Sequence, residues 1–351
     1  MSPIKQYGMV LALAMVFATC LANPSHSLKL TTQTYEIHYP TEVNQLLSQL
    51  NPQNMWNNLI TLTQFPDRSV KHESGVAAAN WLKTQIETAI KNAGRNDAQV
   101  FTVETKGTDP ETNKLFQEKQ PSIVLKIGTS SSPGVVIGAH FDTFGCYSTK
   151  GGYHEDEGCL EDPYGPLPGA NDDGSGTVAV LELARTLLES HMRFKNPIYL
   201  ILYAGEEEGD WGAISVTEYF KNNSIPVKAI MQLDQIGFAY QNDPTIWLET
   251  NEDRVYKVVN DDLTQYLITL TKTYVKKPVV LSCSGSSDEK IWTDKGFAAV
   301  RPLEADYCDF HHMYQDFHTN QDTLDKVSLA HMTDYLKLAT AFIVELAEPF
   351  K

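Results

Sequence analysis

Histidine and carboxylate side chains follow strand-like apolar runs at three places in this sequence, and a similar group stands in a loop near the C-terminus. The segments are VVIGAHFDT, LILYAGEEEG, IMQLDQIG and FHTNQDTLD. Taken singly they predict little, because adjacent charges usually form a solvated turn. The chemistry-bearing residues in these segments are His140, Asp142, Glu206, Glu207, Glu208, Asp234, His318 and Asp322.

A fifth segment, PGANDDGSG, places Asn171, Asp172 and Asp173 between glycines, just before an expected helix. Aspartates there are good helix N-caps, which is their simplest interpretation. Asp234 differs, because a carboxylate within an apolar strand needs a partner or a cation. Two imidazoles and several carboxylates suit a divalent ion such as Zn²⁺. Five ligands are too many for one catalytic zinc, but they suit two ions that share a bridging carboxylate.

The elements that must position these residues alternate between strands and helices. Continuous apolar strands separated by helices indicate a mixed, largely parallel sheet covered on both faces. In such α/β folds, ligands bind outside the carboxyl ends of the strands. We therefore expect one domain, residues 41–351, with a central sheet flanked by helices. The expected strands are SIVLKIG, GVVIGAHFD, IYLILYAG, AIMQLDQIGFAY, TIWLET and short runs near Val279 and Val300; the expected helices lie near VNQLLSQL and at 74–94, 177–190, 211–221, 253–275 and 329–347.

The N-terminus has the pattern of an export signal. Lys5 precedes the apolar run GMVLALAMVFAT and the small residues around Ala22. This predicts a signal peptide over residues 1–22 and a secreted or periplasmic protein. Cys20 also suggests a lipoprotein, but its neighbours are atypical for lipid attachment. Residues 23–40 are interpreted as a pro-segment or a loosely held N-terminus. The formal net charge of −16 disfavours nucleic acid as a partner.

Four cysteines remain after the predicted cleavage. An even number in an exported protein predicts two disulfides, for which three pairings exist. The pairing of sequence neighbours, Cys146–Cys159 and Cys283–Cys308, is preferred. Unpaired buried thiols are the alternative.

The motifs GAHFDT, PGANDDGSG, YAGEEEG, QLDQIG and HTNQDTLD, in this order, resemble the secreted bacterial two-zinc aminopeptidases. These are the leucyl aminopeptidase type of the zinc exopeptidase group, which also includes glutaminyl cyclases. The resemblance covers residues 120–330. It implies the zinc exopeptidase fold, two Zn²⁺ per chain, and hydrolysis of N-terminal peptide bonds through a metal-bridging water and a glutamate general base.

The resemblance also implies a role for each motif residue. His140 and Asp234 would bind the first zinc, Glu207 and His318 the second, and Asp172 both. Glu206 would be the general base, and Asp142 would orient His140, since residues two apart share one face of a strand. The family often has a cis peptide after the bridging aspartate. A register shift by one residue would instead assign these roles to Glu207 and Glu208.

The substrate pocket is expected near Gln235, Phe317 and the residues from Leu281 to Gly285. Gln235 and Glu289 stand where the leucyl enzymes often have an apolar residue and a histidine, which argues against a strict leucine preference. The acidic loop between residues 144 and 167 either overhangs the site and favours basic N-terminal residues or is solvated. His311 and His312 are interpreted as rim or surface residues.

Two other functions compete with the aminopeptidase. A glutaminyl cyclase has the same fold and typically one zinc, and a non-catalytic binding homologue would have lost ligands. The expected partners are peptides with a free N-terminus. We expect no stable membrane association, and a monomer.

Overall fold

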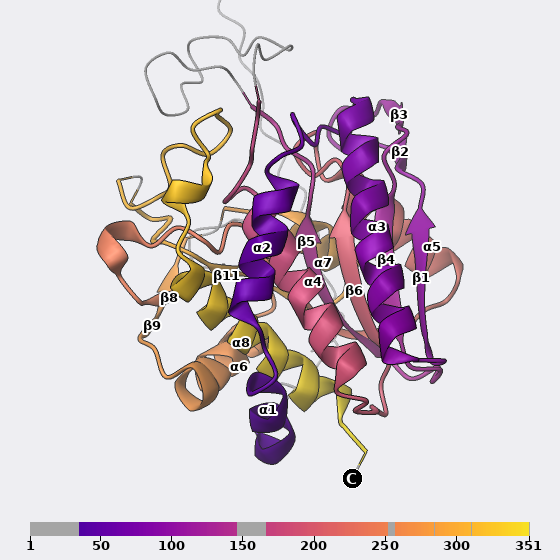
Figure 1. The fold of residues 1–351 in the computed structure, drawn as a ribbon, viewed down its shortest axis with the longest axis vertical. Coiled ribbons are helices and arrows are strands. Elements are labelled where there is room, and N and C mark those ends of the chain that lie inside the picture. Colours follow the sequence, from indigo (N-terminus) through magenta and orange to yellow (C-terminus); the bar gives the residue numbers. More distant parts are fainter. Residues whose placement is uncertain (1–34, 146–165, 252–256, 284, 310, 351) are drawn as a thin grey trace, which may run out of the picture. The chain divides into compact units, whose positions relative to one another are not determined.

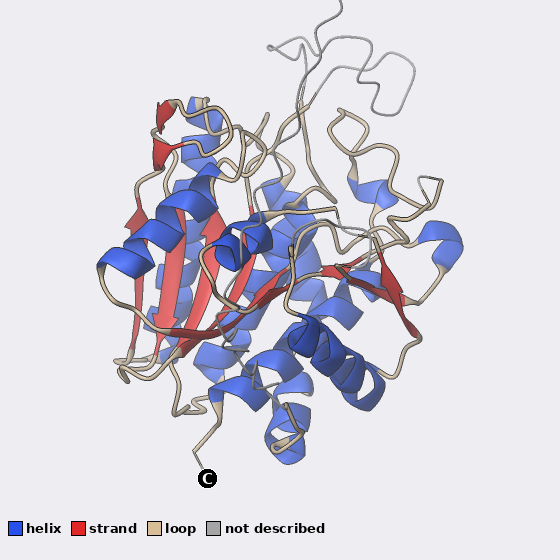
Figure 2. Ribbon diagram, turned by 180° about the vertical axis from the view of Figure 1, so that it is seen from behind, coloured by secondary structure: helices blue, strands red, loops and turns tan. Residues whose placement is uncertain are grey.

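The computed structural model describes residues 35–145, 166–251, 257–283, 285–309 and 311–350. Its centre is a six-stranded sheet with the order β1-β4-β6-β5-β7-β10 (Figures 1 and 2). Strands β6, β5, β7 and the edge strand β10 run parallel, and β1 and β4 are antiparallel to their neighbours. The strands are β1 Ala98–Val103, β4 Ser122–Ile127, β5 Gly134–His140, β6 Ile198–Tyr203, β7 Val227–Gln232 and β10 Ala299–Val300.

Helices cover both faces of this sheet, as its fully apolar middle strands predict. All residues of β5 and β6 are buried, because alternate side chains enter two separate cores. Ile137 and Leu200 face a core with α3, α4 and α8, whereas Val136 and Ile201 face a core with α5 and α7. The helices are α3 Glu73–Ala93, α4 Gly174–Glu189, α5 Trp211–Asn222, α7 Asp288–Asp294 and α8 Leu329–Ala347. The predicted mixed α/β fold is confirmed.

A second, three-stranded sheet lies beside the central one. Its strands are β11 Pro302–Leu303, β8 Ile246–Glu249 and β9 Val279–Ser282, in that order. β8 and β9 pair in parallel, and their hydrogen bonds are separate from those of the central sheet. The remaining elements are α1 Pro40–Leu47, α2 Pro52–Leu62, the hairpin β2 Lys106–Thr108 with β3 Leu115–Gln117, α6 Asp261–Leu270, a π-helical turn Thr271–Val275, and 3₁₀ turns at Tyr240–Asn242 and Leu324–Lys326.

Two predicted elements are shorter in the structure. The helix expected over 253–275 begins at Asp261, where the side chain of Asn260 caps it by accepting from the Leu263 N–H. The strand expected over AIMQLDQIGFAY ends at Gln232, and Gln235 has a left-handed φ of 54°. Asp234 was predicted to lie inside this strand, but it lies in the turn that follows it.

The first described residues are held against the helices. Glu345 of α8 accepts hydrogen bonds from the backbone N–H groups of His38 and Tyr39, at 2.7 and 3.1 Å. Tyr35 stacks on Tyr266 of α6 with ring centroids 5.2 Å apart. The described chain is therefore packed against these helices from Tyr35 on. The predicted signal peptide and most of the predicted pro-segment lie outside the described residues.

One of the two expected disulfides is present. Cys283, just after β9, is bonded to Cys308 in the loop after β11, with a Cα–Cα distance of 4.9 Å. Cys146 and Cys159 lie outside the described residues. Within the part of the chain that is described, no helix has the length and apolar character needed to cross a membrane.

Candidate metal centre

Three neighbouring parallel strands bring the candidate ligands to one edge of the central sheet. His140 is the last residue of β5, Glu206 and Glu207 follow β6, and Asp234 follows β7. Because parallel strands end at the same edge, side chains from three distant parts of the sequence meet there. Asp172 joins them from the turn before α4.

The turn before α4 separates the two aspartates by role. Asp173 is the helix N-cap: its Oδ1 accepts from the Gly176 N–H at 2.8 Å, as the simplest interpretation of this pair predicted. Asp172 instead points at the histidines, and the peptide bond between the two residues is cis, as the family resemblance implied. His318 arrives from the loop before α8.

The ligand candidates form three groups: two share Asp172, and the third consists of His140, Glu206 and Glu207. Oδ1 of Asp172 lies 3.2 Å from His140 Nε2, and its Oδ2 lies 3.2 Å from His318 Nε2. Asp234 Oδ1 is 3.3 Å from His140 Nε2, and Glu207 Oε2 is 2.8 Å from His318 Nε2. In each group the candidate ligand atoms lie within 4.8 Å of one another. We call His140, Asp172 and Asp234 the first position, and Asp172, Glu207 and His318 the second position.

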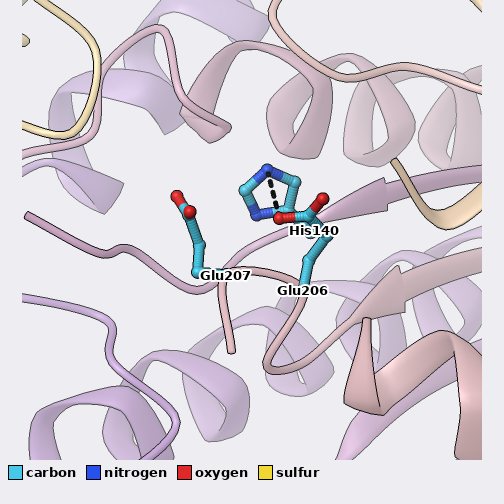
Figure 3. Close-up of side chains that lie close together, drawn as sticks. All are labelled: His140, Glu206 and Glu207. Carbon is cyan, nitrogen blue, oxygen red and sulfur yellow. Dashed lines mark ion pairs between the residues drawn. The ribbon is translucent and has the colours of Figure 1, made fainter. Parts of the chain in front are cut away.

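The three glutamates differ in their surroundings. Figure 3 shows the carboxylates of Glu206 and Glu207 beside the His140 imidazole, with Glu206 Oε2 at 3.9 Å from Nε2. The side chain of Glu206 is 16 % exposed, against 5 % for Glu207. Glu208 is turned away from the site and pairs with Lys71 at 2.5 Å. It therefore has the surface role that adjacent charges usually have.

Asp142 connects two of the motifs. Its Oδ1 lies 3.5 Å from His140 Nδ1, on the side of the ring away from the other carboxylates. The same carboxylate accepts from the backbone N–H of Glu206 at 3.1 Å and of Glu207 at 3.3 Å. The family resemblance implied the first contact, whereas nothing in the sequence indicated the second.

Two further residues support the site: the sequence analysis named Asp322 without giving it a role, and it did not name Arg68. Asp322 accepts from the backbone N–H groups of Asn171 and Asp172, at 2.8 and 2.9 Å, and from the Tyr314 hydroxyl. Arg68 is fully buried and donates to the carbonyls of Phe141 and Gly169, at 2.7 and 2.8 Å. It thus holds the segments after His140 and before Asp172 together.

The pKa shifts of these groups reflect a strong excess of negative charge in the site. Burial alone would lower the pKa of His140, but Glu206 and the surrounding aspartates hold it well above the usual value. Burial would also lower the pKa of His318, but Glu207 and Asp172 hold it well above its usual value. Burial raises the pKa of Glu206 well above its ordinary range. Positive charge supplied by cations would relieve this crowding and leave both imidazoles neutral.

Buried carboxylate oxygens without hydrogen-bond partners also indicate a bound cation. Oδ1 of Asp234 and Oε1 of Glu207 are buried and have no hydrogen-bond partner among the described residues. Buried carboxylate oxygens without partners are costly unless a cation binds them. Histidine and carboxylate donors in this arrangement fit zinc.

A pocket of about 290 Å³ opens above the two positions. Gln235 and Phe317 line it, as predicted, and Gly285, Ser286, Arg301, Tyr307 and Met313 complete its wall.

Other residues expected at or near the pocket lie elsewhere. Leu281 was expected in the wall, but it lies in β9, half-buried against the core, and is not among the described lining residues. Glu289 is fully buried and is not among the described lining residues. His311 and His312 also lie outside the lining, and the acidic loop falls outside the described residues apart from its first and last ones.

Comparisons with known proteins agree with the motifs. The family model described as Peptidase family M28 matches residues 122–343. Leucine aminopeptidase 1 of Paracoccidioides brasiliensis (strain Pb03) is 30 % identical over 324 residues, which cover 89 % of this chain and 75 % of that protein. The crystal structure of the Legionella pneumophila LapA aminopeptidase has a TM-score of 0.77 and 36 % identity, covering 91 % and 78 %.

The comparisons also include a glutaminyl cyclase. The one from Bacteroides thetaiotaomicron shares the fold, with a TM-score of 0.66 at 17 % identity over 84 % of this chain and 97 % of that one. The resemblance to zinc exopeptidases is therefore confirmed, and this chain belongs to peptidase family M28.

Proposed function

We propose that this protein is a zinc-dependent aminopeptidase that removes the N-terminal residue of peptides. The observation that carries the proposal is Asp172, which offers one carboxylate oxygen to His140 and the other to His318. A residue shared in this way suits a pair of ions rather than one. The names of the relatives, leucine aminopeptidase 1 and the LapA aminopeptidase, support the same activity.

The first and second positions would each hold one zinc ion. When bound, the ions would polarise the scissile carbonyl and make a water molecule more acidic. Asp142 keeps the His140 ring in place from behind, so that Nε2 faces the first position. The acidic pocket also attracts the free amine of a peptide, which is the feature that distinguishes an aminopeptidase substrate.

Glu206 is the proposed general base. Its side chain is the more exposed of the two glutamates in the pocket, and it belongs to neither group that shares Asp172. Asp142 fixes the backbone of Glu206 by accepting from its N–H at 3.1 Å. From there it would accept the proton of the attacking water and deliver it to the leaving amine.

The substitution Glu206→Gln tests this proposal. It keeps the size and burial of the side chain but removes the proton acceptor, so turnover of a leucine arylamide should fall by at least about a thousandfold. Zinc content, measured by elemental analysis, should stay at the wild-type value. Wild-type turnover in this variant would exclude Glu206 as the base.

A glutaminyl cyclase is the second candidate, because the fold is shared with known cyclases. The complete second position, with Glu207 and His318 at 2.8 Å, favours the peptidase, since cyclases typically work with one zinc. Parallel assays with a leucine arylamide and a glutaminyl peptide, together with a zinc count per chain, separate the two activities.

We also propose that the protein is exported and acts as a monomer. The signal-like N-terminus and the Cys283–Cys308 disulfide support an oxidising compartment. N-terminal sequencing of the protein from the culture medium or periplasm would locate the cleavage site. A cytosolic protein that keeps residue 1 would contradict this.

A further inference from the structure

Side chains from the segment that carries Asp172 hold the turn that carries Asp234. In this turn, four consecutive backbone N–H groups donate to side-chain oxygens of buried residues. The donors and acceptors are Gln235 N–H to Asp173 Oδ1 at 3.2 Å, Ile236 N–H to Ser175 Oγ at 3.0 Å, Gly237 N–H to Asn171 Oδ1 at 2.9 Å, and Phe238 N–H to Glu304 Oε2 at 2.7 Å. We call Asn171, Asp173, Ser175 and Glu304 the clamp.

Asn171 makes two contacts of opposite kind within the clamp. Its Oδ1 accepts from the Gly237 N–H, and its Nδ2 donates to Glu304 Oε1 at 2.8 Å. A side chain needs both an acceptor and a donor to make these two bonds at once, so neither a carboxylate nor a leucine of similar size can replace the carboxamide. This requirement accounts for an asparagine, rather than a third aspartate, beside Asp172.

Glu304 anchors the clamp beside the small sheet. It follows β11 directly, and its two carboxylate oxygens accept from the Asn171 side chain and the Phe238 N–H. Asp322 and Asp172, which act on Glu304, are both negative. A further carboxylate at residue 171 would therefore add repulsion, whereas the neutral carboxamide adds none.

The two segments pack too closely for a side chain at residue 237. A Cβ atom on Gly237 would lie 2.7 Å from Asn171 Oδ1, and one on Gly176 would lie 2.3 Å from the Leu233 carbonyl oxygen. Such contacts are shorter than van der Waals packing allows, so glycine is needed at both places. The start of α4 and the turn before it therefore lie directly against the backbone that flanks Asp234.

The clamp thereby sets the distance between two candidate ligands. The residue before Asp234 is held by β5, because the Leu233 N–H donates to the Gly138 carbonyl at 2.8 Å. The residue after Asp234 is held by Asp173, and Asp172 lies between two members of the clamp. The Asp172 and Asp234 carboxylates carry like charges and would repel each other without a cation, so the backbone must hold them together.

We propose that Asn171 is a positioning residue of the metal centre, which fixes Asp234 relative to Asp172 through Gly237 and Glu304 and thereby strengthens zinc binding at the first position. The inference rests on the proposed function, since it assumes that both aspartates bind zinc. Residues that orient metal ligands from outside typically change the metal affinity by about tenfold to a hundredfold. A purely structural asparagine would contribute to the free energy of unfolding but not to the zinc affinity, so the two roles make different predictions.

The first experiment titrates the metal-free protein with zinc chloride against a chromogenic chelator. Asn171→Leu keeps the size of the side chain but neither donates nor accepts, so zinc binding should weaken by about tenfold to a hundredfold. At saturating zinc, kcat for a leucine arylamide should fall by at least about tenfold, with a smaller change in KM, because a displaced ligand misplaces the reacting groups. Wild-type zinc affinity in this variant would overturn the proposal.

Asn196 offers a matched control at the opposite end of β6 from Glu206. Its side chain is also buried, and its Nδ2 donates to the Leu346 carbonyl at 3.0 Å. Asn196→Leu should lower the melting temperature but leave zinc affinity and kcat at the wild-type values. A loss of zinc affinity equal to that of Asn171→Leu would mean that any lost buried amide has this effect, and the proposal would fail.

Gly237→Ala disturbs the same contact from the side of Asp234 and leaves the clamp residues unchanged. The added methyl group would lie 2.7 Å from Asn171 Oδ1, so the turn must move. Zinc binding should again weaken by about tenfold or more. Zinc affinity unchanged by this substitution would count against the proposal even if Asn171→Leu did not fold.

Reversing one hydrogen bond tests the contact between Asn171 and Glu304. Glu304→Gln alone turns an NH₂ group toward the donor of either Asn171 or Phe238, so zinc binding should weaken by about tenfold. Asn171→Asp combined with Glu304→Gln restores one donor and one acceptor in the reverse direction and keeps the net charge. The double variant should therefore bind zinc more tightly than Glu304→Gln alone. Equal or weaker binding by the double variant would contradict the proposal.

These outcomes are distinct from a failure of the proposed function. Wild-type protein that binds no zinc would overturn the proposed function itself. Wild-type protein that binds zinc and hydrolyses the arylamide, with variants of unchanged zinc affinity, would overturn only the role of Asn171.

Discussion

The first and second positions differ in how the fold holds them. His140 ends a strand that pairs with a neighbour on each side, and its side chain is 1 % exposed. His318 lies in a loop with a φ of 55°, is 23 % exposed, and is flanked by the rings of Phe144 and Phe317. Strand pairing thus fixes the backbone position of His140, whereas contacts with neighbouring side chains fix the position of His318. Where the backbone does the positioning, fewer side chains are needed to keep a ligand in place.

The largest effect is expected from Asp172→Ala, because this residue alone serves both positions. Zinc content should fall below one ion per chain, and turnover should fall by more than about a thousandfold. Asp173→Asn is the control, since asparagine caps a helix as well as aspartate does. It should keep both ions. Equal zinc loss in the two variants would show that Asp172 acts through the turn rather than as a ligand.

Glu207→Ala should disable the second position alone. One zinc ion should remain, and turnover should fall by more than about a hundredfold. Glu208→Ala removes only a surface ion pair with Lys71, which is worth at most about 1 kcal/mol, and should keep both ions. The reverse result, with zinc lost in the Glu208 variant, would mean that the register of the glutamates is shifted by one residue.

A smaller effect is expected from Asp322→Asn, which weakens the hydrogen bonds to the Asn171 and Asp172 amides. The free energy of unfolding should drop by about 1–3 kcal/mol. The zinc concentration for half occupation should rise by about tenfold. Thermal unfolding and the chelator titration measure the two changes. Asp325→Asn, an exposed carboxylate on the same segment, is the control and should change neither.

The smallest effect is the pH dependence of the free energy of unfolding. A variant remote from the metal centre should change it without any loss of zinc. Burial would raise the pKa of Asp97, but hydrogen bonds from Arg95 and Arg193 outweigh it and lower the pKa to about 2. A depressed pKa contributes stability that is present above the unfolded value and lost as pH falls through the folded one.

Asp97→Asn should therefore cost about 1–2 kcal/mol at pH 7 and less than half of that at pH 2, as measured by urea unfolding. The zinc content of the variant at pH 7 should equal that of the wild type, because Asp97 is remote from the site. A cost that is the same at both pH values would show that the ion pair does not contribute.

The sequence predicted well those features that depend on local pattern. The helix over 329–347 and the helix from Trp211 have their predicted boundaries to within a residue, because their apolar periodicity is a local signal and Ser328 also caps the former. The meeting of His140, Asp234 and the glutamates followed from the rule that parallel strands end at one edge. The motif order then supplied the identity of each candidate ligand.

Features that depend on distant contacts were not predictable. β1 was not expected, because it is an edge strand of mixed exposure without a strong apolar signal. The separation of β8 and β9 into their own sheet depends on pairing partners that one sequence does not reveal. Arg68 stands in a mixed stretch of the sequence and Arg301 between apolar residues, and only the fold shows that both are buried beside the site.

The two sheets contribute different parts of the proposed site. The central sheet supplies the proposed base and most ligands, whereas Gly285 and Tyr307 of the pocket wall follow strands of the small sheet and lie near its disulfide. Substitutions in these wall segments alter the shape of the pocket without touching the ligand side chains. Under the proposed function, substitutions beside the small sheet would therefore change which N-terminal residue is preferred, while the proposed base and ligands beside the central sheet stay the same.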